Sequence, residues 1–378
     1  ARPTLHTWLQ PGNVFWSFRH TRELVPTERI RRGDAVRPLA PAARPELLDV
    51  EVETQWGPMP ASELLGHQRD ALVVLHGDDL LVDWLRHGVR DDEPHLIFSV
   101  TKSVTGLLAG ALAGAGKLDL SASPVDYLPE IAGSGFADAT LRQVLDMEAS
   151  YAFVEDYTPG PDVVAYRHAA GWYPAPEDAL SLQGFLASRA PEGEHGQSFR
   201  YLSPTTDLMG WVCARAAGTT WAEAVSTYLW APIGAEHDAE VTVDREGTPR
   251  AAGGLCVVPR DLARLGLMVA RGGEGVVPEW FVDDLVHNGD PETWARGDFA
   301  ENMPGGRYRS YWYHPGVEPD VVMGVGIHGQ MLYVDIPRQV ERSLREMAPE
   351  VPLDFVRLAV NVDQIATYDL PTRPTKRT

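Results

Sequence analysis

Apolar residues recur three or four positions apart in one short segment of the chain. They are Val100, Val104, Leu107, Leu108 and Leu112. Since glycine and alanine fill most of the positions between them, this period predicts a helix that is apolar on most of its sides. Such a helix belongs in the middle of a fold, and we expect it to end near Gly116.

Shorter patterns predict strands toward both ends of the chain and helices between them. Residues 71–85 form two apolar runs separated by a turn-forming His-Gly-Asp-Asp, which is typical of a β-hairpin. Residues 253–258 predict a strand, and residues 321–335 predict two strands joined near His328. Helical periods cover residues 139–148, 206–217, 221–230 and 260–270.

This order of elements predicts an α/β fold, in which an antiparallel sheet is flanked by helices and a second domain is mostly helical. We assign residues 1–118 and 236–378 to the sheet domain and residues 119–235 to the helical domain. Residues 1–65 are rich in Pro and Arg and only weakly periodic, so we expect an N-terminal arm that wraps the sheet domain.

Composition narrows the class of protein. The chain has 378 residues, of which 44% are hydrophobic, enough for one large core or two closely packed ones. Its formal net charge of −20 repels phosphate backbones and argues against a nucleic-acid partner. We see no leader peptide and no apolar run of membrane-spanning length, so we expect no membrane partner and a cytoplasmic location. Cys213 and Cys256 lie in apolar runs and are predicted to be buried free thiols.

A serine and a lysine at the start of the central helix form the first candidate site. Ser99 and Lys102 are three residues apart, so a helix places the hydroxyl and the amine on one face. The backbone N–H of Ser99, at the helix N-terminus, is also free to face a substrate carbonyl oxygen.

The choice of lysine is informative, because the 33 basic residues include only Lys102, Lys117 and Lys376 as lysines. A desolvated lysine can release its proton at working pH and arginine cannot, which suits Lys102 to proton transfer. The alternative is a lysine that extends from a helix start to solvent.

Two further segments offer groups that could complete such a site. Tyr201 and Ser203 offer a phenol that can carry a proton and a hydroxyl that can hold the lysine. A core tyrosine with a capping serine is the alternative. Gly324 and Gly326 alternate in a predicted strand and would let a ligand approach the backbone, although a strand bend at a packed corner gives the same pattern.

Taken in order, these motifs resemble the β-lactamase-like serine hydrolases, a superfamily that includes class C β-lactamases, DD-peptidases, esterases and the nylon-oligomer (aminohexanoate-dimer) hydrolases. The likeness is greatest to the nylon-oligomer hydrolases and runs from about residue 5 to residue 336. It rests on the segments Phe98–Ser103, Gln143–Met147, Glu155–Tyr157, Ala170–Trp172, Ser226–Ala231 and Gly326–Gln330.

The resemblance implies a β-lactamase/DD-peptidase-like fold and an acyl-enzyme mechanism that needs no cofactor and no metal. Ser99 would be the nucleophile, Lys102 its proton-handling partner and Tyr201 the general acid and base. The backbone N–H groups of Ser99 and Ile327 would form the oxyanion hole. The predicted substrate-binding residues are Tyr157, Arg167, Trp172, Ser203, Trp312 and His328.

Three departures from the family pattern affect the expected substrate. Members that act on β-lactams carry Lys-Thr-Gly or a His variant on the third strand, where this chain has Gly324-Val325-Gly326. Arg167 falls where nylon-oligomer hydrolases can place an aspartate for the substrate's ammonium group, and an arginine there would repel that group. After Pro337 the chain lacks the Val/Ile-rich strand that the family leads us to expect.

We therefore expect a carboxylesterase that cleaves small acyl esters, with that small-molecule ester as its partner and a homodimer left open. Hydrolysis of linear amides, or weak β-lactamase or DD-peptidase activity, is the enzymatic alternative. A non-catalytic ligand-binding relative that keeps the fold is the alternative from a different class.

Overall fold

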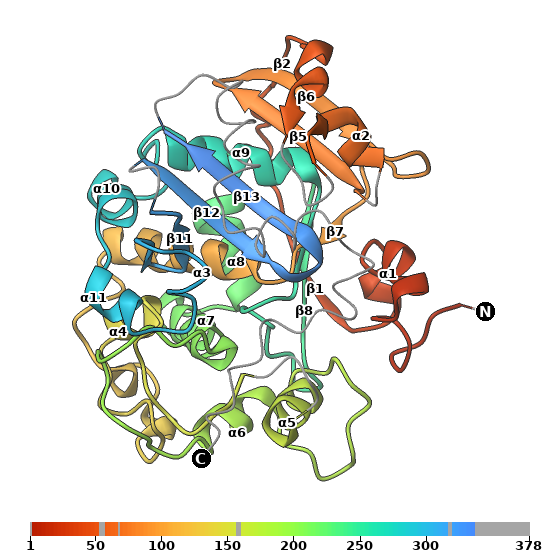
Figure 1. The fold of residues 1–378 in the computed structure, drawn as a ribbon. Coiled ribbons are helices and arrows are strands. Elements are labelled where there is room, and N and C mark those ends of the chain that lie inside the picture. The colour runs from red at the N-terminus through yellow and green to blue at the C-terminus, as the bar shows by residue number, and fades with distance from the viewer. Residues whose placement is uncertain (1, 53–56, 67–68, 156–159, 317–319, 337–378) are drawn as a thin grey trace.

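A computed structural model describes residues 2–52, 57–66, 69–155, 160–316 and 320–336 of the chain (Figure 1). The strands are β1 (Thr27–Ile30), β2 (Ala40–Pro41), β3 (Glu51–Val52), β4 (Met59–Pro60), β5 (Ala71–His76), β6 (Asp79–Leu85), β7 (His95–Leu96), β8 (Ala239–Thr242), β9 (Leu255–Val257), β10 (Arg307–Arg309), β11 (Trp312–His314), β12 (Val321–Gly326) and β13 (Gln330–Asp335). The α-helices are α1 (Pro11–Ser17), α2 (Ala61–Gly66), α3 (Val100–Gly114), α4 (Leu141–Leu145), α5 (Pro161–Ala169), α6 (Leu182–Ala187), α7 (Ser203–Ala217), α8 (Trp221–Val225), α9 (Pro259–Ala270), α10 (Glu279–His287) and α11 (Pro291–Ala295). Short 3-10 turns and a π-helical turn at Ser226–Trp230 complete the secondary structure.

Within the described ranges the strands form separate sheets, ordered β1-β8-β9-β7, β10-β11-β12-β13, β2-β6-β5 and β3-β4. All strand pairs are antiparallel except β2 with β6. The mixed α/β fold with antiparallel sheets flanked by helices is as predicted from the sequence.

Helix α3 lies at the centre of the molecule. It packs against α7 and against strands β11, β12 and β13, and Figure 1 shows it behind the β12–β13 hairpin. Residues 100–112 are all buried, as their apolar period predicted. Two glycines of α3 let neighbouring elements come close. A Cβ on Gly110 would lie 2.5 Å from the Phe281 ring and one on Gly106 would lie 2.1 Å from Ser310 O, and both distances are too short for a side chain. The central helix is therefore fixed on several sides.

A second apolar cluster lies beside the segment that leads into α3. It joins the N-terminal region to the residues before Ser99, and its buried members are Trp8, Val14, Phe18, Val25, Leu96, Phe98, Trp172 and Cys256. Cys213 and Cys256 are both buried and unpaired, as expected. The cluster holds the residue directly before Ser99 in place.

Most elements predicted from apolar periodicity are confirmed. The hairpin at 71–85 forms as β5 and β6, and the strand pair at 321–335 forms as β12 and β13. The helix predicted from 206 begins earlier, at Ser203, because Pro204 fits the first turn of a helix. The helix predicted over 221–230 changes to the π-helical turn at Ser226.

Residues 1–65, predicted as an arm that wraps the sheet domain, also contribute a strand to a sheet. Strand β1 pairs with β8 at the edge of a sheet, with Thr27 opposite Thr242 and Ile30 opposite Ala239. The short length of β1 explains why its pattern did not stand out.

The strands of the described residues lie outside 119–235, where the α-helices are α4 to α8. The predicted division into two domains stays a prediction. The tail after Pro337 lies outside the described residues.

Candidate active site

Ser99 and Lys102 meet at the start of α3, as their spacing predicted. Ser99 directly precedes the first helical residue, and the Lys102 Nζ donates a hydrogen bond to Ser99 Oγ at 3.0 Å. Ser99 is partly exposed, whereas Lys102 is only 1% exposed. The alternative of a lysine extending to solvent is thereby excluded.

The backbone that presents Ser99 is bent at the preceding residue. Phe98 has a φ of 44°, which is uncommon for a bulky side chain and must be held by its surroundings. Thr101 Oγ1 donates to Phe98 O at 2.6 Å and accepts from Leu255 N at 3.2 Å. These bonds tie the bend to β9.

Strand β12 approaches the same bend at its glycines. A Cβ on Gly326 would lie 2.7 Å from Ile97 O and 3.0 Å from Ser99 N, and one on Gly324 would lie 2.8 Å from Ser103 Oγ. The glycines therefore admit the start of α3, which agrees with the packed-corner alternative. Ile327 directly follows Gly326, so this close approach supports the predicted oxyanion pair of Ser99 N–H and Ile327 N–H, which stays a prediction.

The Lys102 amine lies in a buried pocket, where it also donates to Ala252 O at 2.7 Å. Loss of hydration lowers the pKa of Lys102 to about 7. The negative charges of Glu155 and Asp207 oppose this shift, and the positive charge of Arg250 adds to it. An amine with this pKa can accept and return a proton near neutral pH.

Tyr201 completes the trio that the sequence predicted. Its ring centroid lies 5.1 Å from Lys102 Nζ, and the residue is 5% exposed. Burial raises the pKa of Tyr201 well above its usual value, and hydrogen bonds from the side chains of Ser99 and Tyr313 oppose that rise. The phenol is therefore neutral at physiological pH and can donate a proton beside Ser99. Tyr201 N also donates to Asp298 Oδ2 at 2.9 Å.

Ser203 does not hold Lys102, contrary to the role predicted for its hydroxyl. Its Oγ donates to Glu155 Oε1 at 2.7 Å, and its N donates to Glu155 Oε2 at 2.8 Å. A carboxylate at the N-terminus of α7 satisfies free N–H groups and complements the helix dipole. Glu155 belongs to a segment that carried the family resemblance, but no apolar period indicated its contact with α7.

A buried charged group lies behind Lys102. Arg250 pairs with Asp207 of α7 and with the Tyr166 hydroxyl of α5, and its guanidinium lies 4.2 Å from the Tyr166 ring centroid and 5.2 Å from that of Trp172. Asp207 is 1% exposed and Arg250 8% exposed. Sequence reasoning missed both, since isolated charged residues in unrelated segments give no periodic signal.

Two of the predicted substrate contacts lie in the aromatic packing beside Phe98. The Trp172 ring packs edge-on against Phe98 at 5.8 Å, and its Nε1 donates to Thr242 Oγ1 at 3.0 Å. The His328 ring lies 5.0 Å from Phe98 and 4.9 Å from Phe18. Burial lowers the pKa of His328 to about 4, and His95 and Arg167 add to this. These contacts make both residues supports of the bend at Phe98, and their predicted contact with substrate stays a prediction.

The remaining predicted contacts differ in their placement. Trp312 is 0% exposed in β11, so it does not line an accessible cleft, and its neighbour Tyr313 contacts Tyr201 instead, with rings 6.3 Å apart. Arg167 is partly exposed on α5, donates to the Tyr173 hydroxyl and lies 5.0 Å from that ring. Tyr157 lies outside the described residues.

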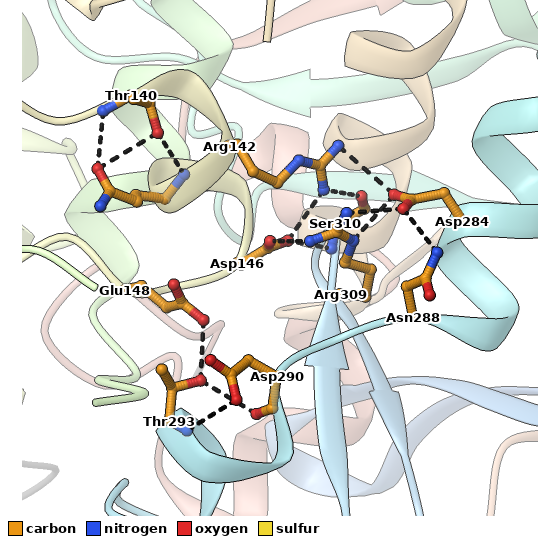
Figure 2. A network of polar contacts seen from close by, with 11 residues as sticks. Thr140, Arg142, Asp146, Glu148, Asp284, Asn288, Asp290, Thr293, Arg309 and Ser310 are labelled. Atoms are coloured by element: carbon orange, nitrogen blue, oxygen red, sulfur yellow. Dashed lines mark hydrogen bonds and ion pairs between the residues drawn. The ribbon is translucent and has the colours of Figure 1, made fainter. Parts of the chain in front are cut away.

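A polar network anchors the β10–β11 hairpin that carries Tyr313 (Figure 2). Asp146, which is 4% exposed after α4, accepts from Arg142 at 3.0 Å, from Arg309 at 2.7 Å and from Ser310 N at 2.9 Å. Arg309 also pairs with Asp284 of α10 at 2.6 Å. Ser310 is held with a positive φ of 51°. The network fixes the turn from which β11 reaches Tyr201.

The described ranges contain neither a metal-binding cluster nor a membrane-spanning helix. Among those residues, no group of three or more His, Cys, Asp or Glu side chains is arranged to hold a metal ion. No helix there is long and apolar enough to cross a membrane.

Comparisons with known proteins show the family of the chain. The beta-lactamase family model matches residues 62–340. The chain is 35% identical over 341 residues to a 6-aminohexanoate-dimer hydrolase of Paenarthrobacter ureafaciens, covering 89% of this chain and 86% of that protein.

Two solved structures show the same fold. A Bacillus anthracis protein named after the 6-aminohexanoate-dimer hydrolases superposes with a TM-score of 0.79 at 25% identity, covering 88% of each chain. EstCE1, a hydrolase with promiscuous acyltransferase activity, superposes with a TM-score of 0.58 at 15% identity, covering 73% of this chain and 88% of the other. The chain, with a serine and a buried lysine joined at the start of its central helix, belongs to the beta-lactamase family of serine hydrolases.

Proposed function

We propose that this protein is a carboxylesterase that cleaves small acyl esters through an acyl-enzyme on Ser99. The observation that carries the proposal is the 3.0 Å hydrogen bond between Lys102 Nζ and Ser99 Oγ, next to the Tyr201 phenol. Acyl transfer needs a nucleophile within hydrogen-bond distance of a base, and a second group beside that base that can carry a proton.

The reaction follows from these groups. Neutral Lys102 accepts the Ser99 proton as Oγ bonds to the ester carbonyl carbon, and the N–H groups of Ser99 and Ile327 stabilise the resulting oxyanion. The carbonyl re-forms as the C–O bond to the alcohol breaks, and Tyr201 supplies the proton to the leaving oxygen, regaining one from Lys102. Water then adds to the acyl-enzyme by the reverse proton route and releases the acid.

Esters require less of this site than amides do, because an alkoxide leaves more readily than an amine, which must first be protonated. Arg167, if it faces the bound substrate, would also disfavour substrates with a free ammonium group. We therefore place small neutral esters first among the substrates.

The second candidate is hydrolysis of linear amides. It is favoured by the 35% identity to a protein named 6-aminohexanoate-dimer hydrolase. Both candidates use the same acyl-enzyme, so they differ in the leaving group and not in the catalytic residues.

A substrate panel tests the proposal. Hydrolysis of p-nitrophenyl esters of increasing acyl length is compared with hydrolysis of the aminohexanoate dimer, in the wild type and in Ser99→Ala. We expect wild-type kcat/KM to be highest on short esters, loss of activity in Ser99→Ala, and an acyl adduct on Ser99 by mass spectrometry with a slow ester. Preference for the amide dimer would support the second candidate. Absence of both turnover and fluorophosphonate labelling would support a non-catalytic protein.

A further inference from the structure

A chain of buried hydrogen bonds connects Asp207 to the Lys102 amine through one residue. Asp207 Oδ1 accepts from Ala252 N at 2.8 Å, and Ala252 O accepts from Lys102 Nζ at 2.7 Å. Lys102 Nζ in turn donates to Ser99 Oγ at 3.0 Å. Asp207, Ala252 and Lys102 are each 1% exposed, so water does not compete for these bonds.

From this geometry we infer that Asp207 is a positioning residue for Lys102. The inference rests on the proposed function, and it assigns Asp207 the task of fixing the residue whose carbonyl oxygen directs the lysine amine toward Ser99. Asp207 touches neither substrate nor Ser99 in this role.

Both edges of the peptide between residues 251 and 252 are held. Thr105 Oγ1 donates to Ala251 O at 2.9 Å from α3, and Asp207 accepts from Ala252 N on the other edge from α7. The following turn is closed by Gly253 N and Gly254 N, which donate to Arg250 O at 3.0 and 2.7 Å. The Ala252 carbonyl belongs to the next peptide plane, which is held through the Gly253 N–H. With both planes held, this carbonyl has little freedom to rotate.

The direction of that carbonyl matters for proton transfer. A neutral lysine amine has two N–H groups and one lone pair, and a carbonyl oxygen can only accept a hydrogen bond. With one N–H fixed on Ala252 O, the amine stays within hydrogen-bond distance of Ser99. Once neutral, it can turn its lone pair to the Ser99 hydroxyl in place of the donated N–H, as removal of the hydroxyl proton requires. A misplaced amine would lose this alignment, and displacements of about 1 Å can cost about 10²-fold in rate.

The second carboxylate oxygen of Asp207 explains how a charge is tolerated there. Asp207 Oδ2 accepts from Arg250 and from the Tyr166 hydroxyl, so the buried charge is paired. One oxygen thus neutralises the charge and the other holds the Ala252 N–H. This division of roles suggests a test that separates the acceptor from the charge.

The test compares two double variants with the same net charge. Asp207→Asn with Arg250→Met keeps an oxygen acceptor for Ala252 N–H, whereas Asp207→Leu with Arg250→Met removes it. Replacing a buried ion pair by apolar side chains often leaves stability unchanged, so both proteins should fold. We expect the leucine variant to acylate about 10²-fold more slowly than the asparagine variant in a stopped-flow burst with p-nitrophenyl acetate. Equal acylation rates in two folded proteins would overturn the inference.

If the leucine variant does not fold, the single Asp207→Asn variant decides the question through its pH profile. Lys102 is faced by Glu155, Arg250, Asp207 and the Tyr201 phenol, and removal of the Asp207 charge makes protonation of the amine harder. We expect the acid limb of kcat/KM to move to lower pH, with the plateau rate within about tenfold of wild type because the acceptor remains. A plateau loss of 10²-fold or more would contradict the positioning role, because the acceptor for Ala252 N–H is still present; the position of the limb reports only the charge of Asp207. A wild type that forms no Ser99 adduct would contradict the proposed function itself.

Discussion

Glu155 accepts two hydrogen bonds from Ser203, one from the backbone N at 2.8 Å and one from the hydroxyl at 2.7 Å. The contact holds the segment before residue 156 to the start of α7, two residues after Tyr201. At the same time the charge of Glu155 acts on Lys102, where it opposes the fall in pKa that burial causes. One carboxylate thus affects both the position of the Tyr201 segment and the proton affinity of the lysine.

We predict that Glu155→Gln shifts the pH dependence of catalysis to lower pH. Without the negative charge, the pKa of Lys102 falls further below about 7, so the neutral amine persists at lower pH and the acid limb of kcat/KM moves down. Glutamine keeps one acceptor for the cap, and the stability loss should be about 1 kcal/mol. Profiles from pH 5 to 9, with the exposed Glu194→Gln as control, check this. A limb that stays in place or moves up would contradict it.

Lys102→Arg should lower kcat/KM by about 10²–10⁴-fold, because arginine keeps the charge and cannot accept the Ser99 proton. In the wild type, kcat/KM should fall about tenfold per pH unit below about pH 7, as the amine of Lys102 becomes protonated. The matched control is Lys117→Arg on the surface, which should retain full activity. Near-wild-type activity of Lys102→Arg would mean that Lys102 is only a structural cation.

Arg167→Asp should change substrate preference without harming the catalytic groups. If Arg167 faces the substrate, a carboxylate in its place would attract a free ammonium group, so kcat/KM for linear amides with a free amino terminus should rise while acetate esters are barely affected. The gain should shrink with added salt. Arg167→Gln removes the charge without reversing it, so its kcat/KM for these amides should lie between the values for the wild type and for Arg167→Asp. Identical kinetics of wild type and Arg167→Asp on the amide, at low and high salt, would place Arg167 outside the site.

His328 should make the fold sensitive to acid. Its pKa is lowered to about 4 from an ordinary value of 6.5, so below pH 6.5 the unfolded chain binds a proton that the native protein does not. This contribution destabilises the native state progressively from pH 6.5 down to about 4, and reaches about 2 kcal/mol at pH 5.

His328→Asn tests this, since asparagine tolerates the left-handed φ of 63° at that position. Urea unfolding at pH 7 and pH 5 should show that the wild type loses about 2 kcal/mol more than the variant over this interval. An equal loss in both proteins would show that His328 does not contribute to acid sensitivity.

The serine–lysine pair and the hairpins could be predicted from the sequence, because each depends on residues that are close together in the chain. Ser99 and Lys102 are one helical turn apart, so any helix that begins there brings them together. The β5–β6 and β12–β13 hairpins are likewise set by adjacent runs and the turns between them.

Contacts between distant segments could not be predicted from the sequence. The hydrogen bonds between Ser203 and Glu155 and between Ala252 N and Asp207 join residues 45 or more positions apart. Trp312 and Tyr313 illustrate a second limit: β11 is buried along its whole length, so alternation of apolar and polar residues could not tell which side chain faces Tyr201.

The Asp146 network has a consequence for how the molecule melts. Arg142 and Asp146 belong to the mostly helical segment between residues 119 and 235, whereas Arg309 and Asp284 belong to the later part of the chain (Figure 2). Separating these segments would take Arg309 away from the Asp146 carboxylate, which would keep Arg142 alone as its cationic partner, and such a loss is unfavourable. The two parts should therefore unfold as a single cooperative unit, with no populated state in which Ser99 is still folded and Tyr201 is not.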